Sequence, residues 1–376
     1  MKSIILFLIS IVFFLQVSYA QDTIVDSTSV KIITDSLLDT NLVPGSDTVV
    51  AVFDEIDQEA EKLYNRGISK FQKGIYESAV GDFSDAISLK PDFEKAYFNR
   101  ASARYEMKDY NGAIEDCNKV ESLNPKLGGV FFLKGRCNYA LGKKEDALLD
   151  YNSAIALDDS NSKLYYYRGG IKFELEDYRG SISDFSSCIM YDPKNANAFN
   201  DRASSKKMID KDEEAKIDYE KAVRLDPKFA IAYNNLGSVK KKLEDTKGAI
   251  LEYSLAIKID PEYFVAYNNR GSTKFDDGDY MGAIEDFNEA VKINPDYAFA
   301  YNNRGAAKLK LEDYDAVIRD CSRAIKINPD YGFAYLNRGI AKEMKRDIDG
   351  ACKDWEKAQE LGVNNAKAYI QQVCVE

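Results

Sequence analysis

Small and aromatic residues recur along this chain with a strict period of 34 residues, from Ala60 to Asn365. In a frame numbered 1 to 34, position 8 is Gly or Ala in all nine repeats, positions 20 and 27 are mostly Ala, and position 24 is usually aromatic. The stretch AYNNRG, which covers positions 3 to 8, stands at Ala266 and again at Ala300. Seven of the eight prolines fall at position 32, the first being Pro91. A fixed period of about 20 to 50 residues indicates a stacked repeat array.

Each repeat is predicted to form two helices joined by a polar turn. Helix A covers about positions 2 to 14, a turn such as DDGDY (276–280) follows, and helix B runs to about position 30. Proline at position 32 ends helix B because it cannot continue a helix. Small residues at positions 8, 20 and 27 let the two backbones approach. Where position 24 shrinks to Cys117 or Cys321, a nearby small position grows to Val120 or Val317, which indicates volume compensation in a packed core.

These positions resemble the signature of the tetratricopeptide repeat family, and the resemblance covers about four fifths of the chain. It implies an all-α fold: a right-handed α-solenoid of nine tandem helix-turn-helix repeats in residues 60–365, closed by a C-terminal capping helix in residues 366–376. Two departures are visible. Position 4 is Tyr or Phe more often than the family's Trp, and position 11 is usually Lys or Arg where the family often has an aromatic residue. Neither changes the expected fold.

The first twenty residues differ from the rest. They combine one Lys, an apolar run from Ile4 to Leu15, and small residues at Ser18 and Ala20. This pattern is typical of a secretory signal peptide in residues 1–20, and the apolar run is short for a membrane anchor, which is the alternative. Residues 21–59, rich in Ser, Thr and Asp, are predicted to form a flexible leader. We therefore expect an exported protein, periplasmic or secreted from a Gram-negative envelope, with no membrane insertion after cleavage.

The amino-acid composition excludes several classes of partner and of active site. The net charge of −11 argues against a nucleic-acid partner, whose phosphates require an excess of Lys and Arg. The chain has no His, which removes serine triads, His-paired cysteine nucleophiles and HExxH zinc sites. An EF-hand-like stretch from Lys345 to Glu356 has Lys at its first ligand position, so it is interpreted as the turn of the ninth repeat. We expect no enzyme activity, no cofactor and no metal.

Six cysteines would enter an oxidising space, and their spacing contains no CxxC or zinc pattern. Buried structural thiols are predicted, with one or two disulfides possible and no pairing indicated by the sequence. These cysteines are Cys117, Cys137, Cys188, Cys321, Cys352 and Cys374.

Charged residues repeat in register. Position 7 is basic in eight repeats, and position 23 is acidic in all nine. The sixth repeat departs at both, with Leu236 at position 7 and Glu252 instead of Asp at position 23. Because the two positions change together, the pattern favours ion pairs within a repeat or between neighbouring repeats over clamps for a ligand carboxylate. The predicted structural pairs include Arg270 with Asp286 and Arg304 with Asp320.

Asn recurs at position 6, which in this family lines the inner groove of the superhelix. Helix interiors do not favour Asn, and its amide offers a donor and an acceptor to the backbone of an extended peptide. Such a row resembles the asparagine ladder by which some tetratricopeptide repeat proteins grip peptide backbones; the alternative is that these residues only cap or solvate the helix. The predicted binding amides are Asn235, Asn269, Asn303 and Asn337 at position 6, with Asn268 and Asn302 at position 5.

Position 2 also faces the groove in this family, and it becomes apolar in the last four repeats. An exposed apolar row marks a partner surface, and the alternative is that the row covers the edge of the neighbouring repeat. The residues of this row are Ile231, Val265, Phe299 and Phe333.

The predicted function is a non-catalytic scaffold or adaptor that binds an extended peptide or a partner protein in the groove. One alternative is a carbohydrate-binding envelope protein that uses groove aromatics at position 12. The other is self-assembly through stacking of the solenoid ends. The position-12 aromatics of the carbohydrate alternative are Phe71, Tyr105, Tyr139 and Phe173.

Overall fold

The computed structural model describes residues 47–374, with side chains from Glu55 onward. The predicted signal peptide and residues 21–46 of the predicted leader lie outside the described residues. The chain divides into two compact units, Met1–Asp150 and Tyr151–Glu376, and each is considered by itself.

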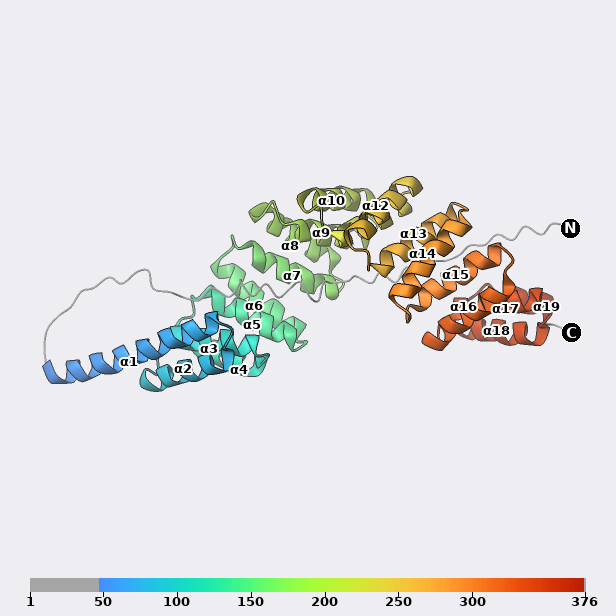
Figure 1. Cartoon of the computed structure of the whole chain (residues 1–376). Helices are drawn as coiled ribbons and strands as arrows, with labels where there is room; N and C mark the ends of the chain where they lie inside the picture. The colour runs from blue at the N-terminus through green and yellow to red at the C-terminus, as the bar shows by residue number, and fades with distance from the viewer. Residues whose placement is uncertain (1–46, 375–376) are drawn as a thin grey trace. The chain divides into compact units, whose positions relative to one another are not determined.

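The described residues form nineteen helices and no strand (Figure 1). The helices of the N-terminal unit are α1 (Asp47–Gln72), α2 (Tyr76–Leu89), α3 (Glu94–Glu106), α4 (Tyr110–Leu123), α5 (Gly128–Ala140) and the first part of α6 (Lys144–Leu157).

The C-terminal unit begins within α6 and continues to the last helix. Its remaining helices are α7 (Ser162–Glu174), α8 (Tyr178–Tyr191), α9 (Ala196–Lys207), α10 (Asp212–Leu225), α11 (Ala230–Lys242), α12 (Thr246–Ile259), α13 (Phe264–Asp276), α14 (Tyr280–Ile293), α15 (Ala298–Lys310), α16 (Tyr314–Ile327), α17 (Gly332–Met344), α18 (Ile348–Glu360) and α19 (Ala366–Val373).

The tandem helix-turn-helix arrangement confirms the all-α prediction. Consecutive helices pack against each other from α1 to α5 in the first unit and from α7 to α19 in the second, and successive odd-numbered helices also touch from α1 to α5 and from α7 to α17 (Figure 1). The odd-numbered helices α1 to α17 are therefore the A helices of the nine repeats, and the even-numbered helices are the B helices. Helix A of a typical repeat covers positions 1 to 13 and helix B covers positions 17 to 30, as in α13 and α14.

The turn between helices A and B has a backbone reason for its polar residues. Position 15 adopts a left-handed conformation in all nine repeats although its residue type varies, with Gly278 at φ 88° and Glu312 at φ 61° as examples. One residue later, an Asp caps helix B in six repeats; for example, the Asp279 side chain accepts from the Gly282 N–H at 2.9 Å. The turn therefore ends one helix and starts the next within three residues.

Position 8 is small because the two helices of a repeat touch there. A Cβ on Gly271 would lie 2.8 Å from the Phe287 ring, and one on Gly339 would lie 2.5 Å from the Trp355 ring. Position 24 supplies the ring in each case. The predicted volume compensation is also present, since Cys117, Cys321 and their enlarged neighbours Val120 and Val317 are completely buried.

The predicted boundary of the leader at residue 59 is wrong for residues 47–59, which are helical. Helix α1 begins at Asp47, so it extends well ahead of the first repeat. The sequence does contain a helical pattern here, because Val49, Phe53 and Ile56 are spaced four and three residues apart, as on one helix face. The Ser- and Thr-rich composition of the segment had favoured a flexible leader instead.

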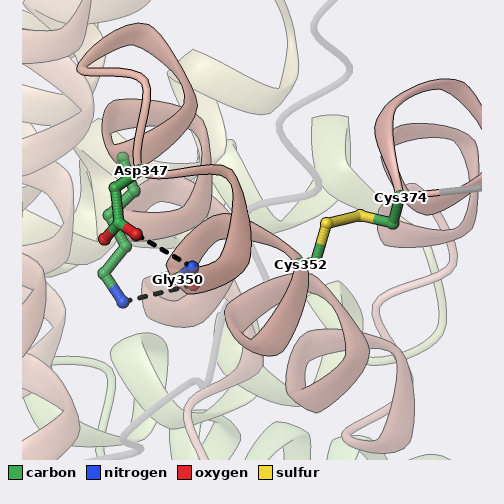
Figure 2. The surroundings of a disulfide bond; sticks show 5 residues. Asp347, Gly350, Cys352 and Cys374 are labelled. Carbon is green, nitrogen blue, oxygen red and sulfur yellow. Dashed lines mark hydrogen bonds between the residues drawn. A yellow bond between two sulfur atoms is a disulfide. The ribbon is translucent and has the colours of Figure 1, made fainter. Parts of the chain in front are cut away.

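The last helix, α19, continues the repeat pattern and then stops. Its Tyr369, at position 4, stacks on the Trp355 ring at 5.0 Å, and its Ala366 is completely buried. A disulfide joins Cys352 in α18 to Cys374 directly after α19 (Figure 2). This short helix therefore covers the end of the ninth repeat and is held there covalently.

The other four cysteines are buried free thiols. Burial raises the pKa of Cys137 and of Cys188 to about 12, so these thiols stay protonated and unreactive at neutral pH. The structure thus separates four packing cysteines from the one pair that forms a bond, a distinction that sequence spacing did not provide.

Replacing Cys374 with Ser should release α19. A helix of eight residues is marginal without tertiary support, and closing a loop of about 22 residues contributes about 3 kcal/mol. Hydrogen exchange of residues 366–373 should become faster, and the fluorescence of Trp355, the only tryptophan, should shift to the red. Unchanged protection and fluorescence would show that packing alone holds the helix.

Candidate interaction face

The predicted Arg–Asp partners lie together in the structure. Arg270 contacts Asp286 through two bonds, Nη2 to Oδ1 at 2.6 Å and Nε to Oδ2 at 3.0 Å. Arg304 and Asp320 repeat this geometry at 2.6 and 2.9 Å. Each pair joins helix A to helix B of the same repeat, and the planar guanidinium matches the two carboxylate oxygens.

A second cation at position 11 binds the same carboxylate. Lys274 lies 2.9 Å from Asp286, and the sixth repeat uses the equivalent Lys240, which donates to Glu252 at 2.5 Å. Without an Arg at position 7, the longer Glu reaches this lysine, which explains why positions 7 and 23 change together. The basic residues at position 11 are visible in the sequence, but their role as a second partner of the acid was not predicted, although positions 7 and 11 lie one helical turn apart.

The first repeat shows the electrostatic effect of two cations. Burial by itself would raise the pKa of Asp82, but hydrogen bonds from Arg66 and Lys70 outweigh it and lower the pKa. The carboxylate at position 23 is therefore held in its ionised form by its own repeat.

The arginines also connect neighbouring repeats. Nη1 of Arg270 donates to Ser254 at 3.0 Å, and Nη1 of Arg338 donates to Ser322 at 3.0 Å. Both serines occupy position 25 of the preceding repeat. The ion pairs thus lie within each repeat, which is the first of the two alternatives, and the contact with the preceding helix B is a hydrogen bond to a neutral serine.

The position-6 amides form a ladder between repeats. In four successive steps, Nδ2 at position 6 donates to Oδ1 at position 5 of the preceding repeat, at 2.9 to 3.1 Å. We call the face of α9, α11, α13, α15 and α17 that carries these residues the ladder face. The four bonds run from Asn235 to Asn200, from Asn269 to Asn234, from Asn303 to Asn268 and from Asn337 to Asn302.

The ladder bonds leave hydrogen-bonding capacity on each position-6 amide. Asn235, Asn269 and Asn303 are partly exposed, whereas Asn337 is only 8 % exposed. An Asn amide has two N–H donors and a carbonyl acceptor, and only one N–H of each position-6 residue is used between repeats. Among the described residues no hydrogen bond reaches Oδ1 of Asn235, Asn269 or Asn337. Asn268 and Asn302 are only 7 % and 5 % exposed, and their carbonyl oxygens accept from the next repeat. These position-5 residues orient the position-6 amides that donate to them. Their own contact with a ligand stays a prediction.

The position-2 row is partly buried, and two of its rings contact tyrosines at position 34. Phe299 lies 5.6 Å from Tyr297 and 5.1 Å from Tyr331, and Phe333 lies 6.5 Å from Tyr331. Asn302 donates to the Tyr331 hydroxyl at 3.2 Å, which connects this row to the ladder. Ile231 and Val265 are also partly buried. The row therefore covers the edges of neighbouring repeats and keeps part of its surface open.

Rings at position 12 close the turn of their own repeat. Phe71 lies 5.4 Å from Tyr76, and Phe173 lies 5.4 Å from Tyr178, with near-perpendicular planes. Tyr105 contacts Tyr110 at 5.5 Å with the two rings tilted by 58°. Three of the four rings on which the carbohydrate-binding alternative depends, those of Phe71, Tyr105 and Phe173, thus have a packing role.

The ladder face changes at the fifth repeat, where position 6 is Asp201. Its carboxylate accepts from the Tyr166 hydroxyl at 2.8 Å and from the Asn200 amide at 3.0 Å. Burial raises the pKa of Asp201 to about 6, and these two hydrogen bonds only partly offset the effect. Each position-23 acid lies within 4.0 Å of a Lys or Arg nitrogen, whereas both hydrogen-bond donors to Asp201 are neutral.

The EF-hand-like stretch has an ordinary structural role. Asp347 caps α18 by accepting from the Gly350 N–H at 3.0 Å (Figure 2). Among the described residues no group of His, Cys, Asp or Glu is arranged to hold a metal ion.

Comparisons with known proteins agree on one repeat type. A TPR repeat model matches residues 271–312, a tetratricopeptide repeat model matches residues 298–331, and a further tetratricopeptide repeat model matches residues 94–127, 196–229 and 230–263. No curated protein matches the sequence.

Among the helices that the structure describes, none has the length and apolar character needed to cross a membrane.

Several solved structures share the fold. The C-terminal part of a TPR repeat-containing protein from Cytophaga hutchinsonii aligns with a TM-score of 0.55 and 18 % identity, covering 64 % of this chain and 98 % of that one. Cut9–Hcn1 of the APC/C aligns at 0.53 and 15 % identity, covering 84 % and 76 %. A tetratricopeptide repeat protein from Parabacteroides merdae aligns at 0.50 and 18 % identity, covering 67 % and 99 %. At these identities the similarity concerns the fold alone.

Replacing Asp286 with Asn should weaken the seventh repeat strongly. The change leaves Arg270 and Lys274 partly buried without their counter-ion, which costs about 3–5 kcal/mol for a buried pair. Denaturant unfolding and hydrogen exchange of α13 and α14 would measure the loss. The matched change at the exposed neighbouring Glu285, to Gln, should cost less than about 0.5 kcal/mol. Equal losses of stability from the two changes would contradict a stabilising role for the ion pairs of Asp286 with Arg270 and Lys274.

Asp201 should make stability depend on pH. Its folded pKa of about 6 is above its ordinary value, so its contribution to stability is greatest in acid and is lost as pH rises through 6. Relative to Asp201→Asn, the wild-type chain should therefore gain about 1 kcal/mol between pH 7.5 and pH 5. Urea unfolding at both values would measure it, and parallel pH profiles for the two proteins would contradict the assignment.

Proposed function

Because the chain is a tetratricopeptide repeat protein, we propose that it is a non-catalytic interaction scaffold that binds an extended polypeptide segment along its ladder face. The matching family models are all repeats of this type, which supports a protein-binding role. The proposed contacts are the amides of Asn235, Asn269, Asn303 and Asn337, with the position-2 row beside them.

The observation that carries the proposal is the fixed orientation of the ladder amides. Each inter-repeat bond uses one N–H and immobilises the side chain, so little rotamer entropy remains to be lost on binding. The second N–H and the carbonyl oxygen match the C=O and N–H of an extended backbone. A backbone ligand of this kind gains affinity from main-chain hydrogen bonds and needs no particular side chains.

The position-2 row supports the same segment. Phe299 and Phe333 are held by ring contacts with the position-34 tyrosines while keeping part of their surface open. Apolar side chains of a bound segment would pack on this surface beside the ladder. The row therefore adds area to the backbone contacts without adding charge.

We also infer that the protein is exported, to the periplasm or beyond the cell. The signal-peptide pattern of residues 1–20 supports export. The Cys352–Cys374 disulfide supports it independently, because such bonds persist in oxidising compartments. Detection of the mature chain starting at Gln21 in an envelope fraction, by N-terminal sequencing, would test the inference.

The ladder can be tested with a neutral probe. We would use a fluorescein-labelled peptide of sixteen residues composed of Ala, Ser, Thr and Gln, acetylated and amidated, and follow its anisotropy. Each lost amide removes hydrogen bonds that contribute about 0.5–1.5 kcal/mol apiece. Changing Asn269, Asn303 and Asn337 together to Ala should therefore weaken binding at least tenfold.

A matched control separates binding from stability. The triple change of Ser186, Ser254 and Ser322 to Ala also removes three inter-repeat hydrogen bonds, but on the helix B side. It should leave the affinity within about twofold, because a factor of two corresponds to only about 0.4 kcal/mol. Equal affinity of the Asn variant and the wild-type chain, or no binding to the wild-type chain, would contradict the proposal.

A further inference from the structure

The ladder face carries one acid within its row of amides. Position 6 is Asp201 in the fifth repeat, in α9, and Asn in the four repeats that follow. Asp201 is partly exposed, so a ligand that follows the ladder can reach it. Asn200, which accepts the first ladder bond from Asn235, donates to Asp201 at 3.0 Å. The acid is therefore continuous with the amide ladder.

The donors to Asp201 are neutral. The Tyr166 hydroxyl from α7 and the Asn200 amide occupy one carboxylate oxygen each, and a carboxylate offers about four acceptor sites. Among the described residues no Lys or Arg lies within ion-pair distance of it. The two cations nearest in sequence are engaged elsewhere: Arg202 and Lys206 both bind Asp218, at 2.7 and 2.8 Å.

The ionisable groups around Asp201 are neutral at physiological pH. Cys188 in α8 and Tyr219 in α10 both have raised pKa values, first because they are buried and then because of nearby negative charge that includes Asp201. From α7 the facing group is Tyr166, and from α11 the ladder contributes the amide of Asn235. The charge of Asp201 is thus left without compensation in its surroundings, in contrast to the acids at position 23.

We propose that Asp201 is a cation subsite of the ladder face, which pairs with an ammonium or guanidinium group of the bound polypeptide. The inference rests on the proposed function and adds a specificity to it. A partly desolvated carboxylate with no counter-ion is costly, and a ligand cation supplies the missing partner. The net charge of −11 attracts the same ligands over a longer range. A segment with a Lys or Arg, or a free N-terminus, at this point of the ladder would be preferred over a neutral one.

Three peptides test the proposal. The first is the neutral sixteen-residue probe, the second has one central Lys in place of Gln, and the third is the neutral probe with a free N-terminal amine. At pH 7.5 the Lys peptide should bind about tenfold more tightly than the neutral one, since one close ion pair is expected to lower the dissociation constant by about this factor. The third peptide distinguishes a terminal ammonium from a side-chain cation as the preferred source.

The preference should depend on Asp201 and on pH. The variant Asp201→Asn carries the residue that the four following repeats have at position 6. In this variant the Kd of the neutral peptide divided by the Kd of the Lys peptide should fall from about ten to about one. In the wild-type chain it should fall to about two at pH 5, where most of the Asp201 carboxyl groups in the free protein are protonated. The control Asp277→Asn, at an exposed turn, removes the same charge and should keep the tenfold ratio.

The outcomes separate this inference from the proposed function. Equal binding of the Lys and neutral peptides, both lost in the Asn triple variant, would overturn the cation subsite and leave the ladder intact. A tenfold preference that persists in Asp201→Asn would also overturn it. Failure of both peptides to bind the wild-type chain would contradict the ladder and the subsite together.

Discussion

The close approach of two helices within each repeat is the constraint on which the rest of this structure depends. Position 8 is Ala in two repeats and Gly in the others, and several of the glycines have no room for a Cβ: one on Gly237 would lie 2.8 Å from the Tyr253 ring, and one on Gly67 would lie 2.7 Å from the Phe83 ring. With the helices this close, an Arg one residue earlier reaches the carboxylate on helix B. The same guanidinium then reaches the preceding repeat, so one packing contact sets the spacing both within and between repeats.

The ladder follows from that spacing. Successive A helices are brought into contact, and an amide at position 6 can reach position 5 of the repeat before it at about hydrogen-bond length. Because Asn is unfavourable inside a helix, a row of paired Asn residues has a cost in helix propensity that the inter-repeat bonds offset. The bonds also fix the amides for a ligand, so stability and proposed binding use the same side chains. Variants of the ladder must therefore be compared with controls that lose equivalent bonds elsewhere.

Much of the fold could be predicted from the sequence because a 34-residue period leaves little freedom. Small residues at position 8, the rings at position 24 and the prolines at position 32 specified the helix pairs to within about one residue. The pairing of position 7 with position 23 was predictable because Leu236 and Glu252 depart together. The start of α1 at Asp47 was not predicted, since that segment lies outside the period and has the composition of a linker.

The candidate site was less accessible to sequence reasoning. Its residues were identified from a periodic row, but a row does not reveal that each amide bonds to position 5 of the neighbouring repeat, because that depends on the offset between helices. The second cation at position 11 was hidden for the same reason. Likewise, the neutral surroundings of Asp201 require three helices to be placed together. The pairing of Cys352 with Cys374 depends on how α19 docks against α18.

The most direct measurement is the nuclear magnetic resonance spectrum of the asparagine side-chain amides, recorded while an uncharged extended peptide is added. The account predicts that the amide signals of Asn235, Asn269, Asn303 and Asn337 shift together, and that peptides of different neutral sequence produce the same set of shifts. Asn288, which binds Arg304 on the helix B side, should stay unchanged. Shifts confined to Asn288 and other helix B residues, with the ladder amides unmoved, would contradict the central claim.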